Sequence, residues 1–169
     1  MKKIISMLCV AMLTTFCASA QSFALVDMEY ILNNVSSYTE ASNEIETLSK
    51  QRQEEVEKVS SEAKTMYENY QKATSLTDAQ RKQREDAIVE KEKEAAELRR
   101  KYFGTDGELA QKRQELMQPI MDNIYEIVKA IAEEDGYSVV LDRASASSIL
   151  FASPDIDISD EVLDRMGNN

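Results

Sequence analysis

The chain has 169 residues, 43% of them hydrophobic and 30% charged, and 31 acidic side chains outnumber 20 basic ones to give a formal charge of −11. It contains no histidine, and its two cysteines, Cys9 and Cys17, lie near the N-terminus. This composition excludes histidine-based catalytic triads. It also disfavours nucleic acid as a partner, because the chain and the phosphates carry charge of the same sign.

Residues 1–20 have the three parts of a secretory signal peptide. Lys2 and Lys3 precede a mainly apolar run up to Phe16, and small residues follow, which predicts cleavage after Ala20. The apolar run is shorter than the roughly 20 residues that span a bilayer. We therefore expect an exported chain with no integral membrane segment, no disulfide and a formal charge of −13.

A short strand and a long amphipathic segment come next. Phe23–Val26 is a continuous apolar run that predicts a strand. From Tyr38 to Ala73, apolar residues recur at spacings of 3 and 4, which predicts one helix of a coiled-coil hairpin, with a stutter near Arg52. This seam comprises Tyr38, Ala41, Ile45, Leu48, Arg52, Val56, Val59, Ala63, Met66, Tyr70 and Ala73.

A second helical segment returns from the tip of the hairpin, which we place at residues 74–77. Thr77 and Gln80 have the spacing of a capping box, in which each side chain accepts a hydrogen bond from the backbone of the other residue. We expect the two arms to cover residues 35–135. The C-terminal part of the second arm is expected to pack on the head.

The second arm contains three residues that disfavour a continuous helix. Gly104 and Gly107 each cost about 1 kcal/mol relative to alanine in a helix interior. Pro119 removes one backbone hydrogen bond and favours a kink. Two interpretations stay open: a local irregularity where the helix meets the head, or a hinge that lets the arms splay.

Residues 136–169 are expected to complete a small β-rich head. Gly136 ends the second arm, and the apolar runs Tyr137–Asp142 and Ser148–Ala152 predict two strands. Runs of this kind are typical of strands that are covered on both faces. Ser159 is expected to cap a short terminal helix.

The head formed by residues 21–34 and 136–169 is expected to be too small to be stable alone. It has roughly 45 residues and no disulfide, which is near the lower limit for a single hydrophobic core. We therefore expect copies of the chain to associate through the head, so that their strands cover one another's edges and their arms enclose a cavity. The expected interface comprises Phe23, Leu25, Val139, Val140, Leu141, Ile149 and Phe151.

Several motifs carry a resemblance to a known family. The most specific are Gly136–Asp142 and the stretch Ile149–Leu163 with its Pro-Asp turn, and the segments 103–109 and 117–120 add to them. Over essentially the whole mature chain, this layout resembles the OmpH/Skp family of periplasmic chaperones. The resemblance implies a mostly α fold with a small β head and long coiled-coil arms.

The resemblance also implies a function. It suggests a periplasmic homotrimer that holds unfolded outer-membrane proteins between its arms without ATP, a cofactor or a metal. Contacts with such clients must be weak, numerous and reversible. Near the tip, Met66, Tyr67, Tyr70 and Leu76 are candidates for client contact, because methionine and tyrosine adapt to varied partners. For Met66 and Tyr70 the alternative is burial in the hairpin core.

The acidic charge departs from the family pattern. Positive tips are thought to help a basic member of the family contact clients and lipopolysaccharide, and the acidic composition here argues against lipopolysaccharide contact. The alternative function is a structural coiled-coil spacer or adaptor of the cell envelope, which the stutter and the glycines disfavour. A prefoldin-like cytosolic hairpin is opposed by the export signal. An enzyme is not expected, because the mature chain lacks thiol nucleophiles and the usual zinc ligands.

Overall fold

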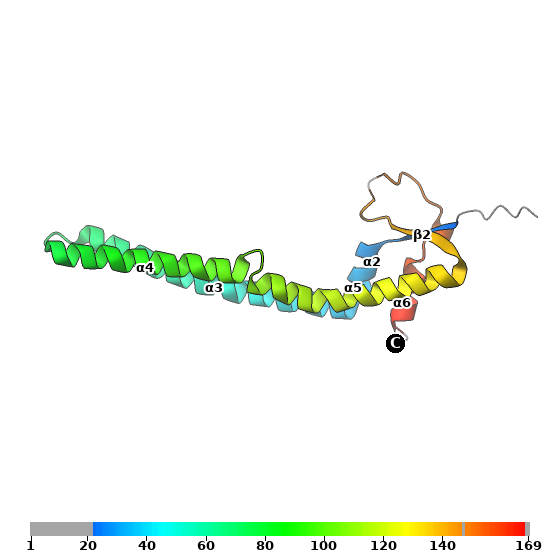
Figure 1. Ribbon diagram of the computed structural model, residues 1–169, viewed down its shortest axis with the longest axis horizontal. Coiled ribbons are helices and arrows are strands. Elements are labelled where there is room, and N and C mark those ends of the chain that lie inside the picture. The colour runs from blue at the N-terminus through cyan, green and yellow to red at the C-terminus, as the bar shows by residue number, and fades with distance from the viewer. Residues whose placement is uncertain (1–21, 147, 168–169) are drawn as a thin grey trace, which may run out of the picture. The chain divides into compact units, whose positions relative to one another are not determined.

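The computed structural model describes residues 22–146 and 148–167, so the expected signal peptide lies outside the described part. Long helices and a sheet of two strands make up this part, which confirms a mostly α fold with a small β element (Figure 1). The chain divides into two compact units, one formed by residues 29–126 and the other by the segments before and after them. None of the described helices is both long and apolar enough to cross a bilayer.

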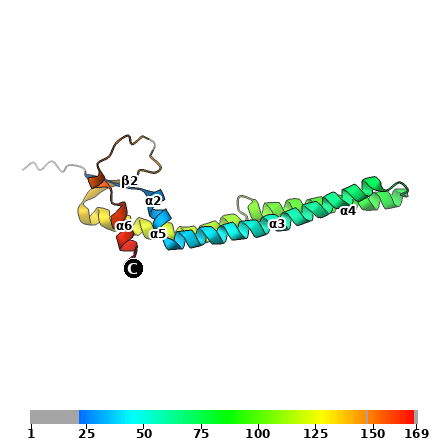
Figure 2. The ribbon, with the colours of Figure 1, turned by 180° about the vertical axis from the view of Figure 1, so that it is seen from behind.

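Residues 29–126 contain the helical hairpin. Helix α3 spans Ser36–Lys72 and α4 spans Asp78–Phe103, and the two lie side by side in both views (Figure 1 and Figure 2). The predicted seam of α3 is confirmed, because every one of its positions is buried or half-buried. Its partners on α4 include the buried Ile88, Ala95 and Tyr102, which recur every seven residues as expected for a coiled coil.

Helix α2, Met28–Asn34, was not predicted from the sequence. Seven residues with one buried side chain, Ile31, are too few to establish a helical period. The first amide of the helix, that of Met28, donates a hydrogen bond to the carboxylate of Asp142 at 3.2 Å. A residue 114 positions away thus contributes to the start of a helix that Asp27, a residue type favoured at helix N-termini, directly precedes.

The tip of the hairpin confirms the predicted capping box. The Gln80 amide donates to the Thr77 hydroxyl at 3.3 Å, and the Thr77 amide donates to the Gln80 side chain at 3.0 Å. Asp78 occupies the first turn of α4, where a negative charge interacts favourably with the helix dipole. These local contacts define where the returning arm begins.

The returning arm is two helices rather than one. Helix α4 ends at Phe103, and α5, Glu108–Asp135, begins after the segment that contains Gly104 and Gly107. The helix is therefore interrupted at the glycines, while α5 continues through Pro119. Gly136 follows α5 with a φ of 75°, the left-handed conformation that glycine adopts readily at helix ends.

The two strands pair in parallel. Strand β1, Ser22–Val26, lies beside β2, Tyr137–Asp142, so that Phe23 is opposite Val139 and Leu25 is opposite Leu141. Both predicted strands are confirmed. After them come a short 3-10 helix, Pro154–Ile156, and α6, Ser159–Gly167.

The strand predicted at Ser148–Ala152 is wrong, because these residues form no regular element. A strand is stable only when a neighbour pairs with its backbone amides and carbonyls. Within the described residues, β1 pairs with β2 on one side and forms an isolated bridge from Leu25 to Asp157. The apolar run predicted a strand, but it carried no information about a pairing partner. Among the described residues, no strand lies beside this segment.

Candidate functional site

One face of the sheet exposes large apolar side chains. Alternate residues of a strand share a face, so the register places Phe23, Leu25, Val139 and Leu141 on the same side. Phe23, Val139 and Leu141 are 46%, 41% and 42% exposed. The expectation that both faces are covered is therefore wrong for the single chain, and only Leu25, at 4%, is enclosed.

The segment after β2 adds two more exposed apolar side chains. Leu150 and Phe151 are 97% and 86% exposed, which is unusual for residues of this type. Ile149 and Val140 are half-buried. Of the expected interface residues, Phe23, Val139, Leu141 and Phe151 are thus accessible in the single chain. Phe23, Val139 and Leu141 share one face of the sheet, and an exposed apolar face is typical of an interaction surface.

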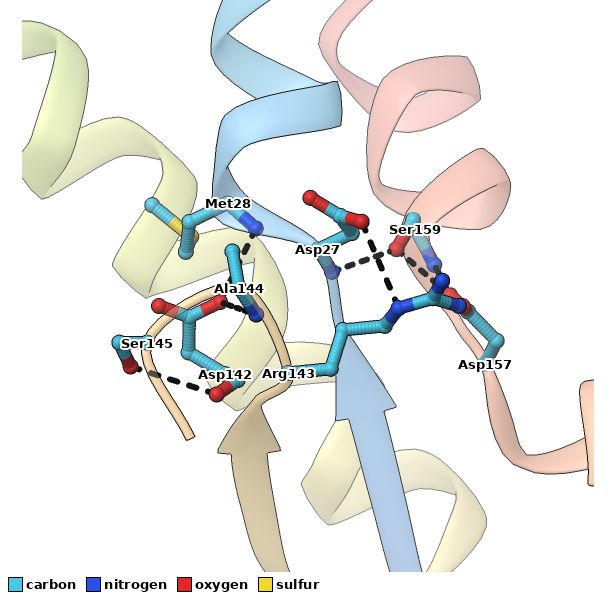
Figure 3. A network of polar contacts seen from close by, with 8 residues as sticks. All are labelled: Asp27, Met28, Asp142, Arg143, Ala144, Ser145, Asp157 and Ser159. Atoms are coloured by element: carbon cyan, nitrogen blue, oxygen red, sulfur yellow. Dashed lines mark hydrogen bonds and ion pairs between the residues drawn. The ribbon is translucent and has the colours of Figure 1, made fainter. Parts of the chain in front are cut away.

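A network of polar contacts joins the ends of both strands to α6 (Figure 3). Asp142 accepts hydrogen bonds from the amides of Met28 and Ala144, at 3.2 and 3.0 Å. Burial acts to raise the pKa of Asp142, but these bonds and those from Ser145 outweigh it and lower the pKa below its ordinary value. The carboxylate is therefore held in its charged form.

The second half of this network centres on Arg143. Its guanidinium pairs with Asp157 at 2.9 Å and with Asp27 at 3.4 Å. Ser159 donates its hydroxyl hydrogen to Asp157 at 2.6 Å and its amide hydrogen to the same oxygen at 3.0 Å. Burial acts to raise the pKa of Asp157, and the bonds from Ser159 and Arg143 lower it overall.

The candidate contact residues lie in the distal half of the hairpin. Tyr67 is 49% exposed and its hydroxyl accepts a hydrogen bond from Gln71 at 2.9 Å. Tyr70 is half-buried, donates to Glu85 and lies beneath the guanidinium of Arg81, 6.0 Å from the ring centre. Met66 and Leu76 are also half-buried. Tyr67 is therefore the most accessible of the four.

Tyr67 borders a shallow groove of about 390 Å³ between α3 and α4. The groove is lined by Ser60, Ala63, Lys64, Tyr67, Glu92, Ala95, Ala96 and Arg99. The small side chains of Ser60, Ala63, Ala95 and Ala96 leave this groove open. Tyr67 and the aliphatic parts of Lys64 and Arg99 form its amphipathic walls. Such a surface suits side chains of varied shape rather than one rigid ligand.

Charge is distributed unevenly along the chain. Although the whole chain is strongly acidic, residues 64–84 at the tip carry five basic side chains against two acidic ones. The basic ones are Lys64, Lys72, Arg81, Lys82 and Arg84, and the acidic ones are Glu68 and Asp78. The tip is therefore locally positive, which the overall charge concealed.

Sequence reasoning missed one cluster in the middle of the hairpin. Arg52, noted only as a stutter in the seam, contacts Glu55, Tyr102 and Glu108. One feature of the sequence pointed to this cluster: an arginine occupies a position in a seam that is otherwise mainly apolar. Among the described residues, no group of acidic side chains is arranged to hold a metal ion.

These features define a class of protein. One unit contains a long helical hairpin with amphipathic side chains along its arms, and the other contains a small sheet with an exposed apolar face. This arrangement favours binding through extended surfaces over chemistry in an enclosed pocket.

Comparison with known proteins identifies the family. The family model for OmpH, the OmpH-like outer membrane proteins, matches residues 22–166, and the chain belongs to this family. The chaperone protein Skp of Yersinia enterocolitica is 24% identical over 147 residues, which cover 87% of each chain. These matches confirm the resemblance to the OmpH/Skp family.

A solved structure gives the same fold. The crystal structure of an OmpH-like protein from Caulobacter crescentus, assigned as an outer membrane chaperone, aligns with a TM-score of 0.69 at 13% identity. The alignment covers 89% of this chain and 86% of the other. At this identity the likeness concerns the fold alone.

Proposed function

We propose that this protein is an ATP-independent periplasmic holdase chaperone that binds unfolded outer-membrane proteins and prevents their aggregation. The observation that carries the proposal is the family match, which spans hairpin and head together and extends to a relative named as a chaperone. The signal peptide predicted at residues 1–20 supports the periplasm as its location. No cofactor or metal takes part in this proposed activity.

The proposed chaperone is a homotrimer. Its interface comprises Phe23, Leu25, Val139, Val140, Leu141, Ile149 and Phe151, with Leu25 acting from within the head by supporting the exposed face. The exposure of Phe23, Val139 and Leu141 supports this interface, because burying the exposed part of each side chain contributes roughly 0.6 to 1.4 kcal/mol. Arms attached to associated heads would surround the client.

Client contact is proposed for Tyr67 and Leu76, with Met66 and Tyr70 as secondary contacts at the border of the hairpin core. Exposure of Tyr67 beside the shallow groove supports this assignment. Each contact is weak, and many in a confined space retain an unfolded chain while it remains mobile. Lipopolysaccharide is not included among the proposed partners.

The experiment that tests the proposal measures aggregation of a denatured outer-membrane β-barrel protein diluted from urea. The purified mature chain should keep the client soluble at about one trimer per client and without ATP. A structural spacer or adaptor, the second candidate, would leave light scattering unchanged. Light scattering from the client at its uninhibited level in a fivefold excess of the chain would reject the holdase assignment.

A further inference from the structure

At the break between α4 and α5 the backbone approaches itself closely. The amide of Gly104 donates to Arg100, that of Gly107 donates to Gly104, and that of Gln111 donates to Gly107, each at 2.9 to 3.0 Å. A Cβ atom added at Gly107 would lie 2.9 Å from three backbone atoms, those of Gly104, Lys101 and Tyr102. The glycines therefore permit close approach of the backbone to itself.

One side chain contacts both helices across this break. From α3, Arg52 donates through Nε and Nη2 to a carboxylate oxygen of Glu108, the first residue of α5, at 3.1 and 2.6 Å. Its guanidinium also lies over the ring of Tyr102, in the last turn of α4, 4.7 Å from the ring centre. Arg52 thus bridges two helices that the chain connects only through residues 104–107.

The cluster is closed by Glu55. Its carboxylate accepts from Arg52 at 3.1 Å and from the hydroxyl of Tyr102 at 2.8 Å. Tyr102 is 3% exposed, so its ring fixes the position of the guanidinium. The hydrogen bond to Glu55 and burial both raise the pKa of the Tyr102 hydroxyl, which stays protonated as the donor.

Open grooves border the break. One of about 700 Å³ is lined by Arg100, Lys101, Gly104, Thr105, Asp106, Gly107, Glu108 and Gln111. Between α3 and α5 lies a groove of about 650 Å³, lined by Asn43, Glu44, Thr47, Leu48, Gln51, Glu108, Gln111, Lys112 and Glu115. The ion pair of Lys112 with Glu44 spans it at 3.0 Å. This ion pair joins α5 to α3 and does not contact α4.

We propose that Arg52, with Glu55, Tyr102 and Glu108, forms a clamp that locks α4 and α5 into one rigid arm at residues 104–107. The break is then a joint at which α4 and α5 change their relative orientation only when the ion pair between Arg52 and Glu108 breaks. This conformational device concerns the hairpin itself and does not depend on the proposed holdase activity. It also explains why an arginine occupies a position in an otherwise apolar seam.

The test measures distances across the joint. The mature chain has no cysteine, so spin labels at Glu97→Cys in α4 and Gln114→Cys in α5 are specific, and labelled chain is diluted into unlabelled chain to suppress distances between copies. The clamp predicts one narrow distance in the parent and a broad distribution in Arg52→Gln and Glu108→Gln. Amides of Gly104, Gly107 and Gln111 should exchange at least about tenfold faster in both variants.

Lys50→Gln is the matched control. Lys50 lies on α3 near Arg52 and pairs only with Glu46 of the same helix among the described contacts, so its loss should leave the distances unchanged. Helicity measured by circular dichroism must stay at the parental level. If Arg52→Gln loses helicity, the distances in Glu108→Gln test the proposal instead. That substitution replaces a single carboxylate oxygen with an amide nitrogen and removes the charge that pairs with Arg52. A broad parental distribution, or variants as narrow as the parent, overturns the proposal.

Discussion

The hydroxyl of Ser159 accepts a hydrogen bond from the backbone amide of Asp27 at 2.8 Å, which joins the end of β1 to the start of α6 across 132 positions of sequence. Ser159 is 4% exposed, so water does not replace this contact readily. The predicted cap at Ser159 therefore has a different role, because its hydroxyl joins two segments of the head instead of bonding an amide of its own helix.

Replacing Ser159 with alanine should destabilise the head. The substitution removes the hydrogen bond from the amide of Asp27, and a lost hydrogen bond in a part-buried place costs roughly 0.5 to 1.5 kcal/mol. The free energy of unfolding, measured by urea denaturation at fixed protein concentration, should fall by that amount. Ser148→Ala, at an exposed position, is the control and should stay within about 0.5 kcal/mol of the parent. Equal values for both variants would refute the role of the buried hydroxyl.

The stability of the head should decrease in acid. The pKa values of Asp142 and Asp157 are lower in the folded chain than in the unfolded one, so the folded state binds fewer protons. Their contribution is complete above the unfolded value of about 3.9 and is lost as pH falls through the lower folded values. Urea midpoints at pH 7, 5 and 3.5 should be similar at the first two and lower at the third.

Asp157→Asn provides the control for this titration. The amide still accepts a hydrogen bond from Ser159, but it carries no charge for Arg143 and does not titrate. The variant should be less stable than the parent at pH 7, and its midpoint should change less between pH 5 and 3.5. A pH dependence identical to that of the parent would show that other carboxylates dominate.

The predictable parts of the fold are those specified by neighbouring residues. Spacings of 3 and 4 gave the seam of α3, and Thr77 with Gln80 gave the start of α4, because helix contacts and caps are local. The strand predicted at Ser148–Ala152 failed, since pairing depends on a partner strand elsewhere. Helix α2 was missed because its seven residues are too few to establish a helical period, and the partner of its first amide, Asp142, is distant in sequence.

The sequence predicted which kind of residue forms the candidate site, but it did not predict how these residues are arranged. Apolar residues of β1 and β2 were expected at an interface, and Phe23, Val139 and Leu141 are accessible as that requires. The sequence did not reveal which residues share a face, because this depends on the register of two strands distant in sequence. The overall charge also concealed the positive tip, since composition averages over segments that are far apart.

Phe151→Asp should convert the proposed trimer into single subunits. Phe151 is 86% exposed in the single chain, so the change costs the folded subunit little, whereas a charge buried in an interface is strongly unfavourable. Mass from light scattering at micromolar concentration should fall to that of one chain with helicity retained. Val89→Asp is the control, because Val89 is 47% exposed on α4 outside the head, and its mass should not change. An unchanged mass in Phe151→Asp would contradict the assigned interface.

Tyr67→Ser and Leu76→Ser should weaken client retention without altering assembly. Each removes an amphipathic or apolar group worth about 1 kcal/mol in a partly buried contact, or roughly fivefold in affinity. The chaperone concentration that halves client aggregation should rise accordingly. Mass and helicity should match the parent. Thr65→Ser, an exposed change on the same helix, is the control, and equal protection by all three variants would place client contact elsewhere.

Gly107→Ala distinguishes a packed joint from a flexible hinge. Gly107 does not have a positive φ, so alanine meets no backbone strain, and its effect comes from a Cβ 2.9 Å from Gly104, Lys101 and Tyr102. Overpacking of this kind should lower the free energy of unfolding by roughly 1 to 3 kcal/mol. Gly167→Ala is the matched control, because no atom lies within 4 Å of its added Cβ, and it should be neutral or slightly stabilising. If Gly107→Ala is also neutral, the backbone there moves aside at little cost, and the segment is a hinge instead of a packed joint.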